Sequence, residues 1–133
     1  MDAALEALVR QRASERCEYC RFPEAFAELP FQIDHVVARQ HGGTPAAENL
    51  ALACCFCNRY KGPNLSGVDP MTNNVIRLFN PREQRWENHF RWDGPLLMGN
   101  TATGRATVRT LNLNRADALA VRRAIMAEGV YPA

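Results

Sequence analysis

Two pairs of cysteines are the side chains of this sequence best suited to bind a metal. Cys17 and Cys20 form one Cys-x-x-Cys pair, and Cys54 and Cys57 form a second. At this spacing one tight turn brings both thiolates of a pair to the same tetrahedral ion, and two pairs supply the four ligands of a structural zinc. We therefore predict one zinc site made by these four residues. A pair made of Cys55 and Cys57 would lose that matching geometry, so we expect Cys55 to be a small buried side chain outside the zinc site.

The residues between and just after the pairs include candidates for the hydrolysis of a phosphodiester. That reaction needs a base to deprotonate the attacking water and a cation to stabilise the developing charge. Asp34 and His35 end an apolar segment, Asn49 precedes the next one, and Asn58 follows the last zinc cysteine. Adjacent strand residues point to opposite faces, so Asp34 and His35 can share a site only where the strand ends or bulges.

From Cys17 to Lys61 this order of residues resembles the HNH endonuclease family, in which paired cysteines accompany Asp-His, Gly-Gly, Asn-Leu and Cys-x-x-Cys-Asn. The resemblance implies that His35 is the general base and that Asp34 and Asn58 bind the catalytic cation. It also implies that Asn49 fixes the orientation of His35. Asparagine at the second ligand position favours Mg²⁺ or Mn²⁺ over zinc or nickel. The implied activity is metal-dependent hydrolysis of DNA, leaving a 5′-phosphate and a 3′-hydroxyl.

Three side chains near this constellation are candidate nucleic-acid contacts. Lys61 lies three residues after Asn58, on the same face of a short helix, where it could touch a phosphate. Arg59 is placed with it as a second basic contact. His41, beside two glycines, is either a loop residue or a phosphate contact.

The elements expected to position these residues are those of a small ββα-metal (HNH, His-Me finger) core with a four-cysteine zinc, an α+β fold. Hydrophobic periodicity and turn residues predict, in order, a helix over 2–13, a strand over 31–37, a loop over 40–45, a strand over 50–53 and a helix over 57–61.

Beyond Pro63 we expect an extension made of a β-hairpin and two helices. A turn-rich stretch over 64–74 precedes a strand over 75–79, and the even spacing of Trp86, Phe90 and Trp92 suggests a strand with one aromatic face. Helices are expected over 103–111 and 114–128, the second capped by Asn114. The segment over 78–107 also resembles the tail of some bacterial HNH proteins.

Several side chains of the extension have two possible roles. The aromatic row is either core or a platform for stacked bases, and His89 is either a surface residue or a DNA contact. The arginines are either a solvated surface or a phosphate-binding face: Arg77, Arg82, Arg85, Arg91, Arg105 and Arg109.

Length and composition favour one domain over 1–133, with a core over 17–62 and the extension over 63–133 packed on it. The chain has 133 residues, 47% of them hydrophobic, and 16 basic against 14 acidic residues, so net charge supports a nucleic-acid partner only weakly. Acidic residues stand where a secretory signal needs positive charge, and no apolar run reaches the length of a membrane span. We expect a soluble cytoplasmic protein that binds DNA and uses no membrane or small-molecule cofactor.

Two other readings remain open beside the nuclease. The chain could be a non-catalytic zinc-knuckle module that binds nucleic acid or a protein partner, or a structural remnant of a nuclease. The intact Asp34, His35, Asn49 and Asn58 argue against the remnant.

Overall fold

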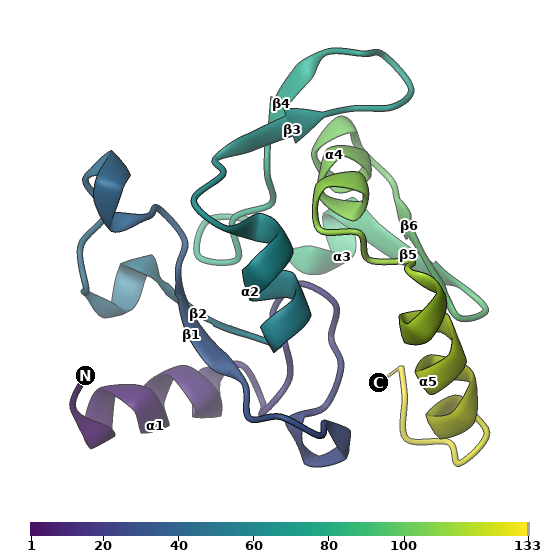
Figure 1. Ribbon diagram of the computed structural model, residues 1–133, viewed down its shortest axis with the longest axis horizontal. Helices are drawn as coiled ribbons and strands as arrows, with labels where there is room; N and C mark the ends of the chain where they lie inside the picture. The colour runs from purple at the N-terminus through teal and green to yellow at the C-terminus, as the bar shows by residue number, and fades with distance from the viewer. Residues whose placement is uncertain (133) are drawn as a thin grey trace.

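The computed structural model describes residues 1–132 as a mixed helix and strand fold (Figure 1). The first half contains α1 (Ala3–Arg12), β1 (Gln32–His35), β2 (Leu50–Ala53) and α2 (Cys55–Lys61), with 3-10 turns at Glu24–Phe26, Arg39–His41 and Ala47–Asn49. The second half contains β3 (Ser66–Val68), β4 (Val75–Arg77), α3 (Trp86–His89), β5 (Phe90–Asp93), β6 (Leu96–Gly99), α4 (Ala102–Thr110) and α5 (Ala116–Met126). The expected α+β ββα order with a four-cysteine cluster is confirmed.

The hairpin of β1 and β2 is the frame on which the candidate residues are placed. The strands are antiparallel, with Gln32 opposite Ala53, Asp34 opposite Ala51 and His35 opposite Leu50. Side chains at opposed positions share a face, so Gln32 and Asp34 lie on the face that carries the two alanines. These small residues leave room for α2, whose side chains hydrogen-bond to that face, as the next subsection describes. Figure 1 shows α2 lying against the hairpin.

One hydrophobic cluster joins the two halves of the chain. Tyr19 packs edge-on against Phe79, and Phe79 packs on Phe90, with ring centroids 6.5 and 5.3 Å apart. Trp86 closes the cluster, because its indole N–H donates to the Tyr19 carbonyl at 2.8 Å. The second half therefore packs directly on the segment that carries the first pair of cysteines. Among the helices described within residues 1–132, none has the length and apolar character to cross a bilayer.

The prediction of one strand through Trp86, Phe90 and Trp92 is wrong in its first part. Trp86 begins the short helix α3, and only the other two rings lie on β5. A separation of four residues puts two side chains on one face of a helix or of a strand, so the spacing alone does not distinguish the two. Both side chains are buried, which places them in the core rather than on a surface open to bases.

The turn-rich stretch over 64–74 contains a strand that sequence patterning does not reveal. β3 pairs with β4, with Gly67 opposite Ile76. A side chain at Gly67 would lie 2.0 Å from the Thr110 hydroxyl oxygen, so glycine is needed for α4 to pack against this strand. Gly67, one of the residues that suggested a loop, therefore permits the contact between β3 and α4.

The cap of the last helix also differs from the prediction. Arg115 is the residue that precedes α5, and Asn114 pairs instead with the backbone N–H and carbonyl of Leu97, both at 2.9 Å. Arg122, a buried residue of α5, donates to the Pro95 carbonyl at 3.0 Å and to Asn114 Oδ1 at 3.1 Å. Asn114 therefore fastens β6 to α5 rather than capping the helix.

The β3–β4 hairpin, which projects at the top of Figure 1, is held by a buried ion pair. Both carboxylate oxygens of Asp69 accept from the Arg105 guanidinium at 2.9 Å, and they also accept from the Met71 N–H and the Thr72 hydroxyl. These bonds hold the pKa of Asp69 well below its usual range, with the Arg105 bond the largest cause. Arg105 is therefore an internal partner and not part of a phosphate-binding face.

We expect Asp69→Asn to lower the thermal midpoint by several degrees at neutral pH. A carboxylate whose pKa is lowered on folding stabilises the protein above the unfolded pKa, and that contribution is lost as the pH falls through the folded value. Thermal unfolding followed by circular dichroism at pH 7, where thiolates can keep zinc bound, measures the difference from wild type. Asp93→Asn, at the exposed end of β5, is the control, and an equal loss in both variants would contradict the assignment.

Candidate metal centre and active site

The four sulfur atoms of Cys17, Cys20, Cys54 and Cys57 lie together in the interior. All four lie within 4.8 Å of one another, and Cys20 Sγ is 3.9 Å from Cys54 Sγ. Tetrahedral zinc, with bonds of about 2.3 Å to sulfur, separates its ligands by about 3.8 Å. The cluster thus fits the zinc ion that the spacing predicts.

Each pair is shaped by a turn in which a backbone N–H points at the first sulfur. The Cys20 N–H donates to Cys17 Sγ at 3.5 Å, and the Cys57 N–H donates to Cys54 Sγ at 3.3 Å. Cys54 is also the residue that caps α2. Contacts with the other three thiols, first of all Cys17, hold the pKa of Cys57 well above its usual value. A bound cation reverses this preference, because zinc binds thiolates.

The first cysteine pair is fastened to the rest of the fold by the residue inside it. Glu18 donates its backbone N–H to the Leu52 carbonyl at 2.8 Å, and its carboxylate accepts from the Leu52 N–H at 2.9 Å. The same carboxylate pairs with Arg82, which is therefore an internal ion-pair partner. From the chain's last turn, the Tyr131 hydroxyl donates to the Cys20 carbonyl at 2.8 Å. The metal centre is thus bonded to both halves of the chain.

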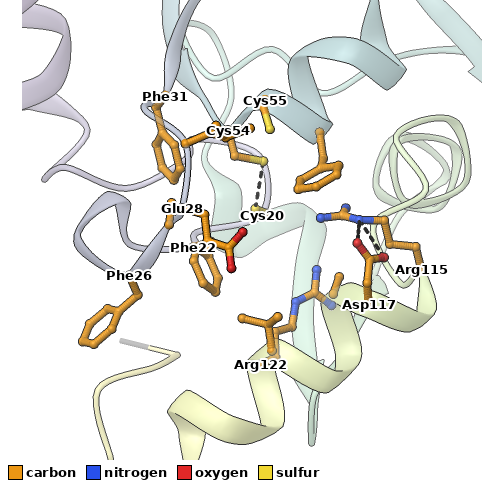
Figure 2. A pocket seen from close by; sticks show the side chains of 15 residues that line it. Cys20, Phe22, Phe26, Glu28, Phe31, Cys54, Cys55, Arg115, Asp117 and Arg122 are labelled. Carbon is orange, nitrogen blue, oxygen red and sulfur yellow. Dashed lines mark hydrogen bonds and ion pairs between the residues drawn. The ribbon is translucent and has the colours of Figure 1, made fainter.

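Cys55 takes no part in the cluster and borders a cavity beside it (Figure 2). It is half-buried, more open than a core cysteine. The cavity has a volume of about 280 Å³ and lies between the first cysteine pair and α5, and Arg115 lies 3.9 Å over the Phe56 ring at its wall. This is the Gln32–Ala53 end of the hairpin, opposite to His35. None of the expected catalytic residues lines it, within the part of the chain that the structure describes.

His35 is the last residue of β1 and is half-buried. Its Nε2 atom is enclosed by protein, and among the described residues it has no hydrogen-bond partner. A buried polar atom without a partner destabilises the fold, so each one needs an explanation such as a bound water, an ion or a catalytic role. Arg82 Nε is the other such side-chain atom of the described residues. His35 therefore holds a ring nitrogen that the protein itself does not use.

Asn49 fixes the backbone immediately after His35. Its side-chain oxygen accepts from the Val37 N–H at 2.9 Å, and its amide group donates to the carbonyls of Val37 at 3.0 Å and Thr44 at 2.8 Å. Its own carbonyl accepts from the Val36 N–H at 2.9 Å. Gly43 lies so close to the Val37 carbonyl that a side chain there would overlap it. Asn49 therefore ties the end of the loop between the strands to the residues that directly follow β1.

Asp34 lies on the other face of the strand and is 5% exposed. Its Oδ2 accepts from the Tyr19 hydroxyl at 2.8 Å and lies 3.1 Å from Lys61 Nζ. Burial raises the pKa of Asp34, although Lys61 and the Tyr19 bond both oppose the rise. Burial, together with this carboxylate, holds the pKa of Tyr19 well above its usual value, so the phenol remains a donor. Tyr19 was missed from the sequence, where it is only the third residue of a Cys-x-x-Cys turn.

The expected phosphate contact by Lys61 does not fit the structure. The residue is 2% exposed, and its ammonium group also donates to the Val36 carbonyl at 3.0 Å and the His35 carbonyl at 3.3 Å. Helical spacing does place Lys61 and Asn58 on one face of α2, but that face lies on the hairpin rather than in solvent. The prediction that Lys61 and Asn58 share a helical face is correct, but the prediction that this face meets a nucleic acid in solvent is wrong for Lys61.

The remaining candidates are more open. Asn58 is half-buried, and its Nδ2 donates to Gln32 Oε1 at 2.5 Å, so it lies on the same hairpin face as Asp34. His41 and Arg59 are both exposed. His89 is half-buried, with Nδ1 2.7 Å from the Thr101 hydroxyl, and is thus a partner within the fold rather than a plain surface residue.

We expect Cys20→Ser to lose zinc and to unfold, because structural zinc of this kind contributes on the order of 10 kcal/mol. Cys55→Ser is the matched control, since the thiol at this position is outside the cluster. It should keep one zinc per chain and a free energy of unfolding within about 1 kcal/mol of wild type. Metal analysis and urea unfolding measure both quantities. Retention of zinc and stability by Cys20→Ser would rule out the four-cysteine site.

Comparison with known proteins gives one match. Residues 17–64 match the family model described as HNH endonuclease. No curated protein and no solved structure matches the chain. The matched segment begins at the first cysteine of the cluster, contains β1, β2 and α2 complete, and ends just after Lys61. Over residues 17–64 this chain is therefore similar to the HNH endonuclease family.

Proposed function

We propose that this chain is a metal-dependent endonuclease that hydrolyses phosphodiester bonds of DNA, with His35 as the base that activates water. The observation that carries the proposal is the enclosed Nε2 of His35, without a partner among the described residues, at the end of β1 in the matched segment. A general base needs a ring nitrogen free to accept a proton. The bonds of Asn49 to Val37 support a fixed backbone at this position.

Asp34 and Asn58 are the proposed ligands of a Mg²⁺ or Mn²⁺ ion. Both offer oxygen atoms, which these hard cations prefer, and both belong to the interface between α2 and the hairpin. The bound ion would supply positive charge to the phosphate oxygens as the transition state forms. Each ligand already has a protein partner, Lys61 for Asp34 and Gln32 for Asn58, so binding of the ion requires these side chains to rearrange.

DNA is the proposed substrate because the family model describes an endonuclease. The exposed His41 and Arg59 are the proposed phosphate contacts. His41 follows His35 by six residues, on the loop that Asn49 closes, and Arg59 follows Asn58 on α2. Basic contacts of this kind set the register of a nucleic acid without reading its sequence.

A non-catalytic zinc-knuckle module is the second candidate. It is favoured by the burial of Asp34 and by the two described cavities, neither of which is lined by His35 or Asn58. Such a module would bind nucleic acid or a protein partner through its exposed residues. It predicts no dependence of function on His35.

Cleavage of plasmid DNA by the zinc-loaded chain with Mg²⁺ or Mn²⁺ tests the nuclease. We expect His35→Ala to lower kcat by about 10²–10⁴-fold, the usual contribution of a general base. Zinc content and unfolding should stay near the wild-type values, because no hydrogen bond to the ring is lost. His89→Ala is the matched control and should retain activity. Equal rates in wild type and His35→Ala, or no cleavage with either ion, would reject the proposed role.

We expect Arg59→Ala to weaken binding to duplexes of unrelated sequence to a similar extent. A phosphate contact contributes through release of counterions, so the slope of log K against log salt should become shallower by about one unit. Fluorescence anisotropy at several salt concentrations measures the slope. Arg123→Ala, at an exposed position on α5, serves as the control. An unchanged slope for Arg59→Ala would remove Arg59 from the interface.

A further inference from the structure

The single lysine of this chain lies in the interior, surrounded by oxygen atoms at the end of β1. Lys61 Nζ is 3.1 Å from Asp34 Oδ2, 3.0 Å from the Val36 carbonyl and 3.3 Å from the His35 carbonyl. An ammonium group has three N–H donors, and these three oxygens can use all of them. The side chains of Lys61 and Asp34 are 3% and 5% exposed. The pair is therefore closed to solvent, unlike an ordinary surface ion pair.

The same oxygen atoms are of the kind that binds a hard divalent cation. Mg²⁺ and Mn²⁺ prefer carboxylate and carbonyl oxygens, and a positive charge held close by weakens their binding. Asp34 is the one carboxylate bonded to Lys61 among the described residues. Repulsion between two cations is strong where the surroundings are buried, so an ammonium and a divalent ion that share this carboxylate weaken each other's binding.

We propose that Lys61 and the divalent cation compete for Asp34, so that binding of the cation releases the Lys61 ammonium from the end of β1. This inference rests on the proposed function, which takes Asp34 as a ligand. Lys61 is here a positioning residue. Before the cation binds, its ammonium holds the Asp34 carboxylate and the carbonyls of His35 and Val36 in one arrangement. Tyr19 stays bonded to Asp34 in both states, because its neutral hydroxyl is compatible with a second ligand.

Competition of this kind lowers the apparent affinity for the cation. The ion binds only the fraction of molecules in which Lys61 has left, and the observed dissociation constant rises as that fraction falls. Lys61→Met keeps most of the side-chain volume and removes the charge. We therefore expect Lys61→Met to bind Mn²⁺ at least about tenfold more tightly than wild type, as measured by electron paramagnetic resonance.

Because Lys61 is the only lysine, it can be observed alone in the wild-type chain. Labelling with ¹³C,¹⁵N-lysine gives one side-chain signal in nuclear magnetic resonance spectra of the zinc-loaded protein. On titration with Mg²⁺ the Cε and Nζ signals should shift with a saturable dependence, and the ammonium hydrogens should exchange faster with water. In Asp34→Asn, Mg²⁺ should produce no such shift. NaCl at matched ionic strength controls for general salt effects.

Two results would overturn the competition. One is a Lys61 signal that stays unchanged while wild type binds Mg²⁺ to saturation. The other is a Lys61→Met chain that binds Mn²⁺ no more tightly than wild type. Lys61→Met could be unfolded in the absence of a cation. In that case competition predicts that Mn²⁺ refolds the variant at a concentration below the one that saturates wild type. Failure to refold at such a concentration would contradict the competition.

These outcomes are distinct from failure of the proposed function. Cleavage that requires His35 together with an unchanged Lys61 signal overturns the competition alone. A saturable Lys61 shift without any cleavage of DNA supports the competition and rejects the nuclease. A chain that binds neither Mg²⁺ nor Mn²⁺ overturns both.

Discussion

The position of every candidate residue depends on four sulfur atoms that two distant turns bring to one place. Cys20 and Cys54 are 34 residues apart in sequence, yet their sulfurs are 3.9 Å apart. The chain between them forms the hairpin, and the second turn begins α2 directly. An ion bound by all four sulfurs would close this long loop and lower the entropy that the chain loses on folding. A short two-stranded hairpin is only marginally stable alone, so this closure is what makes it a usable frame.

The two ends of the hairpin are held by different physical means. At the Gln32–Ala53 end the constraint is the sulfur cluster, and at the His35–Leu50 end it is a set of polar bonds. Asn49 fixes the backbone that follows His35, and Lys61 binds the carbonyls of the strand end from the opposite face. Metal ligation resists change at constant pH, whereas hydrogen bonds and ion pairs can exchange partners. Asp34 and His35 lie at the end that can rearrange, whereas Asn58, the other residue proposed to bind the cation, contacts Gln32 at the opposite end.

Features set by local spacing could be predicted from the sequence. Two Cys-x-x-Cys pairs define their turns within four residues each, and the order of strand, loop, strand and helix follows from short apolar segments and glycines. What could not be predicted depends on contacts between distant residues. Tyr19 meets Asp34 across 15 positions and Lys61 meets it across 27. Lys61 was expected to touch a phosphate because it shares a helical face with Asn58, and that spacing does not show that the buried carboxylate of Asp34 holds it in the interior. β3 was missed because Gly67 is typical of a turn, and the reason for a glycine there is the close packing of Thr110 on α4, which is distant in sequence.

The burial of Lys61 limits covalent modification of lysine in the folded chain. Fifteen of its sixteen basic residues are arginines, and the one lysine has its amine enclosed. Acylation, or conjugation of another polypeptide to a lysine amine, requires a free and neutral nitrogen that reaches solvent. Within residues 1–132, lysine-directed tagging therefore demands that the strand end open first, so the folded domain is shielded from this chemistry while an unfolded chain is not.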